Sequence, residues 1–235
     1  MNIFAIDKNY KLCSIVLDNK RVVKMILESA QLLCNGIRRI NVIGSPELFD
    51  DAILNKLYKP THMNHPCSFW AGDSPVNWVW LYYYFFHLCN IYDNYISKNM
   101  IYNISTSIQY HHKSFEKLNP VFEIVLKTFE DCFNNGLKFK EEYIYNNIVE
   151  HPNCTIYKDI GDVYLAYKMC LFNKWENLDK IPPKFSYYTI TNFMDFNDDR
   201  LYFYNLLLNI MYNDNDIPET DKTHLRKLEF LKPIL

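Results

Sequence analysis

Glycine is scarce in this chain, with five residues among 235. An all-β fold that turns on glycines is therefore disfavoured, whereas 16 phenylalanines and 19 tyrosines favour helices that pack through bulky side chains. Hydrophobic residues make up 49% of the chain, which is enough for a core at this length. We therefore predict an ordered, mainly α-helical protein.

The chain also lacks a long hydrophobic run and a recognisable secretion signal. Its most apolar window, residues 76–89, is shorter than the roughly 20 residues that a membrane-spanning helix needs. Its first residues have neither the basic start nor the apolar centre of a signal peptide, and its seven cysteines are odd in number and irregularly spaced. We expect an intracellular, reducing environment and no membrane partner.

A strong net charge is absent as well, because the formal charge is −2. This value argues against a protein that coats nucleic acid through bulk electrostatics. The charge is uneven: residues 1–60 hold nine basic and six acidic side chains, whereas residues 121–235 hold thirteen and eighteen. An anionic ligand is therefore expected at the N-terminal part, with His112 and Lys113 as a further basic pair.

Three common signatures of enzymes are missing: a glycine-rich phosphate loop, the zincin pattern and a nucleophile elbow. Common kinases and nucleotide hydrolases lose support for this reason. The chemistry has to be sought in less conventional groupings of side chains.

Capping and helix-breaking residues mark the expected helices. Asp18 can accept the free amides of a first turn and Asn35-Gly36 provides a stop, so we predict a helix over residues 19–34. Asp73-Ser74-Pro75 opens another helix, whose aromatic residues to position 97 make it the expected central, most buried helix. Further helices are predicted over 46–57 after Ser45, 114–134 before Asn135-Gly136, 141–149, 160–177 and 198–212.

The remaining segments contain helix breakers or lack helical periodicity. Prolines and a glycine predict a loop over residues 59–73, and residues 98–112 are ambiguous. Residues 2–6 could form a strand or an extended arm. Without internal repeats, the economical architecture is a multi-helix core domain of residues 1–187 with a helical appendage of residues 188–235.

A stripe of polar side chains lies on one face of the first long helix. Lys20, Lys24, Glu28 and Gln31 recur at helical intervals, with Arg21 beside them. If the stripe faces a cleft, its three basic groups would bind phosphate. Glu28 would then act as a general base or stabilise a cationic intermediate. Spacing alone favours the alternative of a solvated stripe, with Lys–Glu pairs worth about 0.3–0.5 kcal/mol each.

The loop that follows contains His62, Asn64, His65 and Cys67. A histidine that acts as acid or base is the functional interpretation that we favour over a metal. A metal site with both histidines and Cys67 is an alternative, but the spacing fits no strong zinc pattern, so we predict no metal ligands. The structural explanation is that these side chains bond the backbone of a proline-containing loop.

A second polar stripe lies within the most apolar helix. Asn77, Trp80, Tyr84 and His87 follow one another at intervals of three, four and three residues. Core packing is the favoured explanation, because such residues usually satisfy one polar atom when buried. If the stripe borders a pocket, its rings and Trp70 would stack on a nucleobase while Asn77 bonds an edge of the base.

Several blocks within residues 1–187 resemble a small protein family common in phages and other DNA viruses. The blocks are MNIF, LDNKRVVKMILESAQLL, THMNHPCSFW, SPVNWVWL, HHKS, and DVYLAYKMCLFNKWEN with IPPKF behind it. The first 100 or so residues are also similar, more distantly, to pyrimidine-dimer DNA glycosylases. The shared layout is a short N-terminal segment, a first helix with a catalytic glutamate, a histidine-containing turn and a long second helix.

In those glycosylases the N-terminal amine attacks the sugar to form a Schiff base, and the helix glutamate assists. The resemblance implies that Glu28 takes the role of the assisting glutamate. The chain departs from the pattern at its start, because the initiator methionine is usually retained before a residue the size of Asn2. Lys20 or Lys24 would then have to replace the amine, or Glu28 or His65 would activate a water molecule.

We therefore predict an intracellular viral enzyme, in host cytoplasm or nucleus, that processes a nucleobase or its glycosidic bond in DNA or a nucleotide without a cofactor. The predicted catalytic residues are Glu28, Lys24, His62 and His65, and the predicted binding residues are Lys20, Arg21, Asn64, Trp70, Asn77, Trp80, Tyr84, His112 and Lys113. One alternative is a non-enzymatic viral protein that binds a nucleotide, or a protein through its aromatic-rich or acidic C-terminal part. Another is a base-modifying transferase, which would need the same pocket.

Overall fold

The computed structural model describes residues 2–43, 48–97 and 111–174, which form helices and no strand. The mainly α-helical fold is thus confirmed for this part of the chain. Its elements are α1 (Tyr10–Ile15), α2 (Asn19–Ile43), α3 (Asp51–Leu54), α4 (Pro66–Asp73), α5 (Pro75–Ile91), the π-helix η1 (Tyr92–Ile96), α7 (Lys113–Phe133), α8 (Glu141–Asn147) and α9 (Val163–Asn173).

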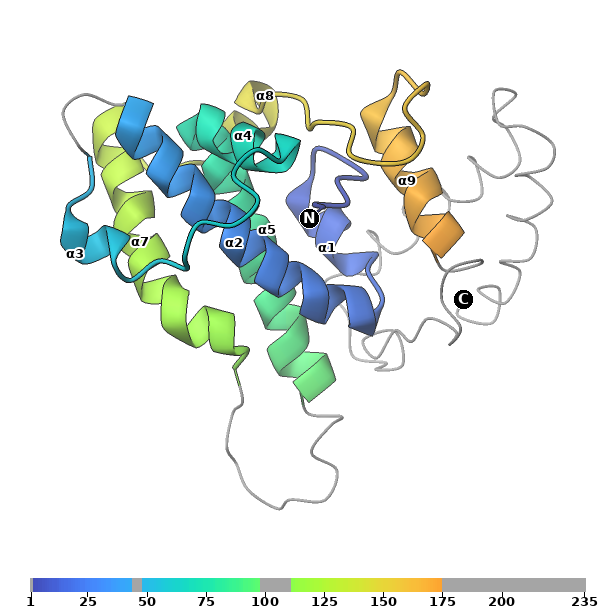
Figure 1. The fold of residues 1–235 in the computed structure, drawn as a ribbon, viewed down its shortest axis with the longest axis horizontal. Helices are drawn as coiled ribbons and strands as arrows, with labels where there is room; N and C mark the ends of the chain where they lie inside the picture. Colours follow the sequence, from blue (N-terminus) through green and yellow to red (C-terminus); the bar gives the residue numbers. More distant parts are fainter. Residues whose placement is uncertain (1, 44–47, 98–110, 175–235) are drawn as a thin grey trace, which may run out of the picture.

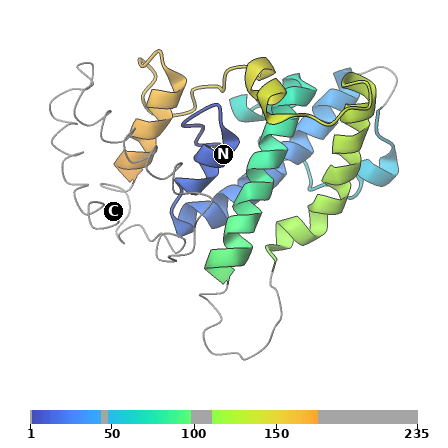
Figure 2. The same cartoon turned by 180° about the vertical axis from the view of Figure 1, so that it is seen from behind.

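The long helices α2 and α5 cross at the centre of the molecule (Figure 1). Helix α7 flanks them on one side, and α9 lies at the opposite end, beyond the N-terminal segment (Figures 1 and 2). Helix α5 packs against α1, α2, α4, α7 and α8. The prediction that this helix is central is therefore confirmed. It buries eleven of its 17 residues, a smaller share than the five of six in α1, so the prediction that it is the most buried is wrong. In the portion of the chain that the structure describes, a helix that is both long and apolar enough to cross a bilayer is not found.

Helix α2 begins where the sequence predicts but does not end there. The Asp18 carboxylate accepts the amides of Lys20 and Arg21, at 3.1 and 3.2 Å. The expected stop at Asn35-Gly36 is wrong, because α2 continues to Ile43. Asn35 is buried and its side-chain amide donates to Thr61 O at 2.7 Å and Ser68 Oγ at 3.0 Å. A tertiary contact, rather than a helix end, therefore explains the asparagine.

Gly36 has a packing role in the same stretch. A Cβ atom at this position would lie 2.7 Å from the backbone oxygen of Ala71 and 3.0 Å from the ring of Trp78. Only glycine lets α4 approach α2 this closely. The sequence signal for a C-terminal cap was in fact a signal for a close helix crossing.

The loop predicted over residues 59–73 is wrong in its second half, where α4 forms. His65 is the N-cap, and its Nδ1 accepts the amide of Cys67 at 3.2 Å. Pro66 occupies the first turn, where the missing amide hydrogen costs nothing. The proline therefore starts a helix here instead of preventing one.

The other predicted helices are confirmed with shifted ends wherever the structure describes them. Helix α5 is capped by Ser74, whose Oγ accepts the amide of Asn77 at 3.1 Å. Helix α7 ends before Asn135 and Gly136, which both have positive φ. The helix predicted over 46–57 is reduced to α3, capped by Asp50, and α1 was not predicted. Residues 44–47, 98–110 and 175–235, with the appendage and the helix predicted over 198–212, lie outside the described part.

The N-terminal segment is extended and belongs to the core. Residues 3–6 are at most 4% exposed and pair in no sheet within the described chain. The side chain of Asn2 turns the backbone by accepting the amides of Ile3 and Phe4, at 2.8 and 3.4 Å. Phe4 then adopts a φ of 51°, a conformation that a buried aromatic residue rarely takes.

Candidate functional site

The backbone nitrogen of Asn2 donates a hydrogen bond to Glu28 Oε2 over 2.9 Å. The two residues are 26 positions apart, and residues 3–6, which follow Asn2, are buried in the core. The Glu28 side chain is 14% exposed. A carboxylate thus sits at the edge of the core with one oxygen directed at the first described nitrogen of the chain.

The second carboxylate oxygen of Glu28 pairs with Lys24. The distance from Lys24 Nζ to Glu28 Oε1 is 3.4 Å, the i,i+4 contact expected on one helix face. Lys24 is 67% exposed, and Leu27, the residue before Glu28, is 44% exposed. The helix face outside Glu28 is therefore open to solvent and carries a cation.

His65, the N-cap of α4, is a second titratable group of this region. Burial lowers the pKa of His65, while the carboxylate of Glu28 raises it in part. Since Nδ1 accepts the Cys67 amide, the neutral ring carries its proton on Nε2, an assignment made from this hydrogen bond. A neutral imidazole can accept a proton from a bound molecule or donate one to it.

His62 and Asn64 lie in the exposed turn before α4. His62 has a φ of 50°, and its backbone oxygen accepts from Ser68 Oγ at 2.9 Å and from the His65 amide at 2.9 Å. Its ring nitrogen Nδ1 lies 2.8 Å from Thr61 Oγ1. The turn is therefore held by its backbone, which leaves the exposed side chains of His62 and Asn64 available to a ligand.

Tyr84 of α5 is fully buried. Its ring stacks on Trp80 with centroids 5.5 Å apart, and its buried hydroxyl has no hydrogen-bond partner within the described residues. Burial raises the pKa of Tyr84, with smaller contributions from the charges of Cys13 and Glu28. The hydroxyl is a polar group that a water molecule or ligand atom could satisfy.

Three residues that were predicted to bind a nucleobase are buried and form hydrogen bonds within the core. The Nε1 atom of Trp70 donates to Val149 O at 2.9 Å, and that of Trp80 donates to Lys8 O at 2.6 Å. Asn77 uses both ends of its amide within the fold. In this structure their faces and edges pack against protein, as the structural explanation anticipated, and they are not open to a nucleobase.

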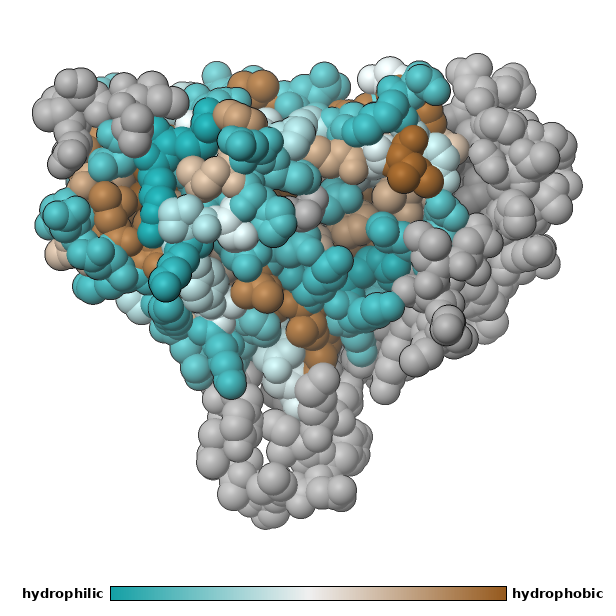
Figure 3. All heavy atoms as spheres, in the orientation of Figure 1, coloured by the Kyte–Doolittle hydropathy of each residue, from teal (hydrophilic) through white to brown (hydrophobic). Residues whose placement is uncertain are grey.

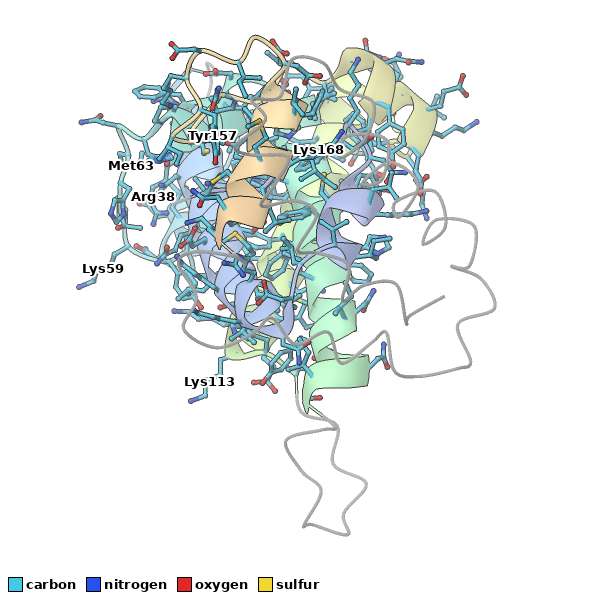
Figure 4. The ribbon with its side chains drawn as sticks, turned by 90° about the vertical axis from the view of Figure 1, so that its right-hand side faces the viewer. Arg38, Lys59, Met63, Lys113, Tyr157 and Lys168 are labelled. Carbon is cyan, nitrogen blue, oxygen red and sulfur yellow. The ribbon has the colours of Figure 1, made fainter. Side chains whose placement is uncertain are left out.

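Three of the predicted basic contacts have partners or positions elsewhere in the structure. Arg21 is buried and forms an ion pair with Asp18, while Lys20, one residue earlier, is exposed. His112 caps α7 through Nδ1, which accepts the Ser114 amide at 3.2 Å. In Figure 4 the exposed Lys113 extends from the lower end of the molecule, whereas Met63, in the turn between His62 and Asn64, is at the upper end. The structure therefore does not join His112 and Lys113 to the site.

Cys154 is a neighbour of the site that sequence reasoning missed. Its Sγ lies 3.5 Å from Cys67 Sγ, although the two cysteines are 87 residues apart. A ligand atom of His65 lies within 4.8 Å of both sulfurs. No spacing pattern in the sequence links Cys154 to the residues of α4. Beyond the odd number of cysteines, with no disulfides expected, the sequence offered no signal for this neighbour.

Comparisons of this chain with protein-family models, with curated proteins and with solved structures found no match. The site is accordingly interpreted from its geometry. Its elements are the residue-2 nitrogen, the carboxylate of Glu28, the cation of Lys24 and the imidazole of His65.

Proposed function

We propose that the protein processes the glycosidic bond of a nucleotide in DNA, as a DNA glycosylase with lyase activity. The observation that carries the proposal is the 2.9 Å contact between the backbone nitrogen of Asn2 and Glu28 Oε2. These are the two groups that the distant resemblance to pyrimidine-dimer DNA glycosylases assigns to catalysis. Nothing in their spacing along the sequence required them to meet.

The chemistry follows if the residue-2 nitrogen is a free amine. The amine nitrogen forms a bond to C1′ of the sugar, the glycosidic bond breaks, and the base leaves with its electron pair and takes up a proton. The C1′–O4′ bond then breaks and O4′ takes up a proton, so that the nitrogen, having lost one amine proton, forms a protonated Schiff base with C1′. Glu28 can accept the amine proton and stabilise the cationic sugar, because its carboxylate already contacts that nitrogen.

This version requires removal of the initiator methionine, because an amide nitrogen is not a nucleophile. If the methionine is retained, Glu28 or the neutral imidazole of His65 would activate water, and the product is a free base without a covalent adduct. Lys24 is less suited as the nucleophile. Lysine is activated by burial or by neighbouring cations, whereas Lys24 is 67% exposed and pairs with a carboxylate.

The surroundings of Glu28 fit a polyanionic substrate. Lys20 and Lys24 are exposed on the same helix, and residues 1–60 carry more basic than acidic side chains. His62 and Asn64 supply donors from the turn before α4. These groups can contact phosphates around the sugar that Glu28 would address.

A broad, exposed apolar surface would support the alternative that the protein is a non-enzymatic protein-binding module. On the face shown in Figure 3, hydrophobic side chains of the described residues form small separate groups among hydrophilic ones. The polar site at Glu28 is the more specific feature of this part of the chain. We therefore favour the enzyme.

The test is borohydride trapping with duplex DNA that contains a cyclobutane pyrimidine dimer, an abasic site or no damage. The wild type should form a covalent adduct with damaged DNA, and Glu28→Gln should reduce trapping and base release by about 100-fold or more. Leu27→Ala, at an exposed neighbouring position, is the matched control and should retain both. Intact mass of the purified chain shows whether the initiator methionine is present.

The outcomes separate the versions of the mechanism. An adduct that maps to residue 2 supports the amine, and an adduct lost in Lys24→Ala supports the lysine. Base release without an adduct supports activated water. If neither adduct nor base release occurs with any of the three DNAs, the proposed function is wrong.

A further inference from the structure

A second grouping of reactive atoms shares His65 with the Glu28 site. It consists of a ring nitrogen of His65 and the sulfurs of Cys67 and Cys154, and these three ligand atoms all lie within 4.8 Å of one another. The sulfur atoms are 3.5 Å apart, and both cysteines are free thiols. Two residues come from the start of α4, and the third comes from the segment between α8 and α9.

The distances suit a small tetrahedral metal ion. Zinc binds cysteine sulfur at about 2.3 Å, which places two sulfurs of one tetrahedron roughly 3.8 Å apart. The separation of 3.5 Å therefore requires only a small adjustment. Two thiolates with an imidazole form a soft ligand set that selects zinc over magnesium or calcium.

Both ligand-bearing segments are fixed before any metal arrives. The first turn of α4 positions the backbones of His65 and Cys67, and Cys67 is fully buried. Metal binding would replace the hydrogen bond that His65 Nδ1 accepts from the Cys67 amide, because the metal takes the Nδ1 lone pair or leaves the ring proton on Nδ1. Around Cys154, the Oδ1 atom of Asn153 accepts from the amide and hydroxyl of Thr155, at 3.1 and 2.7 Å. Tyr167 of α9 supports the same segment by donating its hydroxyl to Pro152 O at 2.8 Å. Little ordering remains to be done on binding, which favours a site.

We propose that His65, Cys67 and Cys154 form a zinc site, with water or an external anion at the fourth position. His62, which the sequence offered as a ligand, is not part of this cluster, and Cys154 takes its place. The metal would tie the start of α4 to the segment that precedes α9. This assignment rests on the positions of these three side chains and not on the glycosylase proposal. A zinc-bound His65 could not also act as the base that activates water, so in the zinc-loaded protein that role would fall to Glu28.

The experiment uses the full chain, reduced and stripped with a chelator, and then supplied with Zn²⁺ or Co²⁺ alone. We expect one Zn²⁺ per chain after gel filtration and the thiolate-to-metal absorption of tetrahedral Co²⁺. The half-buried Cys154→Ser should weaken binding by roughly 100-fold or more. Cys132→Ser, at an exposed thiol of α7, and His62→Ala are the matched controls and should bind as the wild type does.

Thermal unfolding gives a second measurement that does not depend on activity. Zn²⁺ should raise the unfolding temperature of the wild type and of Cys132→Ser, but not that of Cys154→Ser. The proposal is overturned if the wild type retains no zinc or if Cys154→Ser binds it equally well. A disulfide between Cys67 and Cys154 that persists in reductant would also overturn it. Failure of DNA trapping would leave all of these results unchanged.

Discussion

The side-chain oxygen of Asn77 accepts the backbone amide of Val149 over 3.0 Å, across 72 positions of the chain. The nitrogen of the same side chain donates to Trp70 O at 2.9 Å. One buried amide therefore joins α5 to α4 and to the segment after α8. Asn77→Ala would leave both backbone groups unpaired, each at a cost of about 1–3 kcal/mol.

We accordingly expect Asn77→Ala to lower the free energy of unfolding by roughly 2–4 kcal/mol in urea titrations. Asn146→Ala, at an exposed position of α8, should change it by less than about 0.5 kcal/mol. Equal effects of the two substitutions would show that the two hydrogen bonds of Asn77 do not stabilise the fold.

His151 predicts a dependence of stability on pH. Its ring stacks on Trp70 with centroids 4.3 Å apart, both ring nitrogens lack partners within the described residues, and burial lowers its pKa to about 3. Because the folded pKa lies below the unfolded value of about 6.5, the unfolded chain takes up the proton first as pH falls. The contribution of the neutral His151 ring to the free energy of unfolding is complete above about pH 6.5 and is lost as the pH falls toward 3.

Between these limits the free energy of unfolding should fall by about 1.4 kcal/mol per pH unit because of this one group. His151→Phe should remove that component, so that urea titrations between pH 7 and pH 4 give a shallower slope. His87, whose pKa burial lowers to about 4, supplies a remaining slope in both proteins. Parallel profiles for wild type and His151→Phe would contradict the prediction.

Gly36 predicts a steric effect at the crossing of α2 and α4. Gly36→Ala places a methyl group 2.7 Å from the Ala71 oxygen, and overpacking of this kind costs about 1–3 kcal/mol. The better helix propensity of alanine, about 1 kcal/mol, offsets only part of this cost. Thermal unfolding should show a lower unfolding temperature for Gly36→Ala. Gly161→Ala, with no atom within 4 Å of the added Cβ, should be neutral.

Arg21 and Lys20 are neighbours in sequence but should respond differently to truncation. Arg21 is buried in an ion pair with Asp18, so Arg21→Ala should lower the free energy of unfolding by about 3 kcal/mol or more. Lys20→Ala at its exposed position should cost less than about 1 kcal/mol. If DNA binds, Lys20→Ala should instead reduce the salt dependence of affinity, measured by titration at several ionic strengths.

Local signals in the sequence were sufficient for much of the fold. Asp18 and Ser74 cap the helices that they were expected to cap, and Asn135 and Gly136 follow the end of α7. These predictions succeed because a cap or a positive φ depends on the residue and its immediate neighbours. Gly36 shows the limit: the same residue type serves a C-terminal cap and a close helix contact, and only the partner helix distinguishes them.

The site was less accessible from sequence for the same reason. The Lys24–Glu28 pair follows from helical spacing, whereas the approach of Asn2 to Glu28 depends on how residues 3–6 pack. Cys154 has no local pattern that connects it to Cys67. Conversely, Trp80 has the spacing of a ligand-facing stripe but is fully buried, because one face of a helix can meet protein as well as a ligand.

The burial of residues 3–6 couples the candidate site to the stability of the whole molecule. Since Asn2 is the outer end of a core segment, the distance between its nitrogen and Glu28 is set by packing rather than by a free arm. Conditions that loosen the core, such as mild heat or denaturant, would therefore lengthen this distance. The geometry of the site would then depend on the packing of the core. A conservative substitution at Ile3, which forms no part of the site, would change the distance between the Asn2 nitrogen and Glu28.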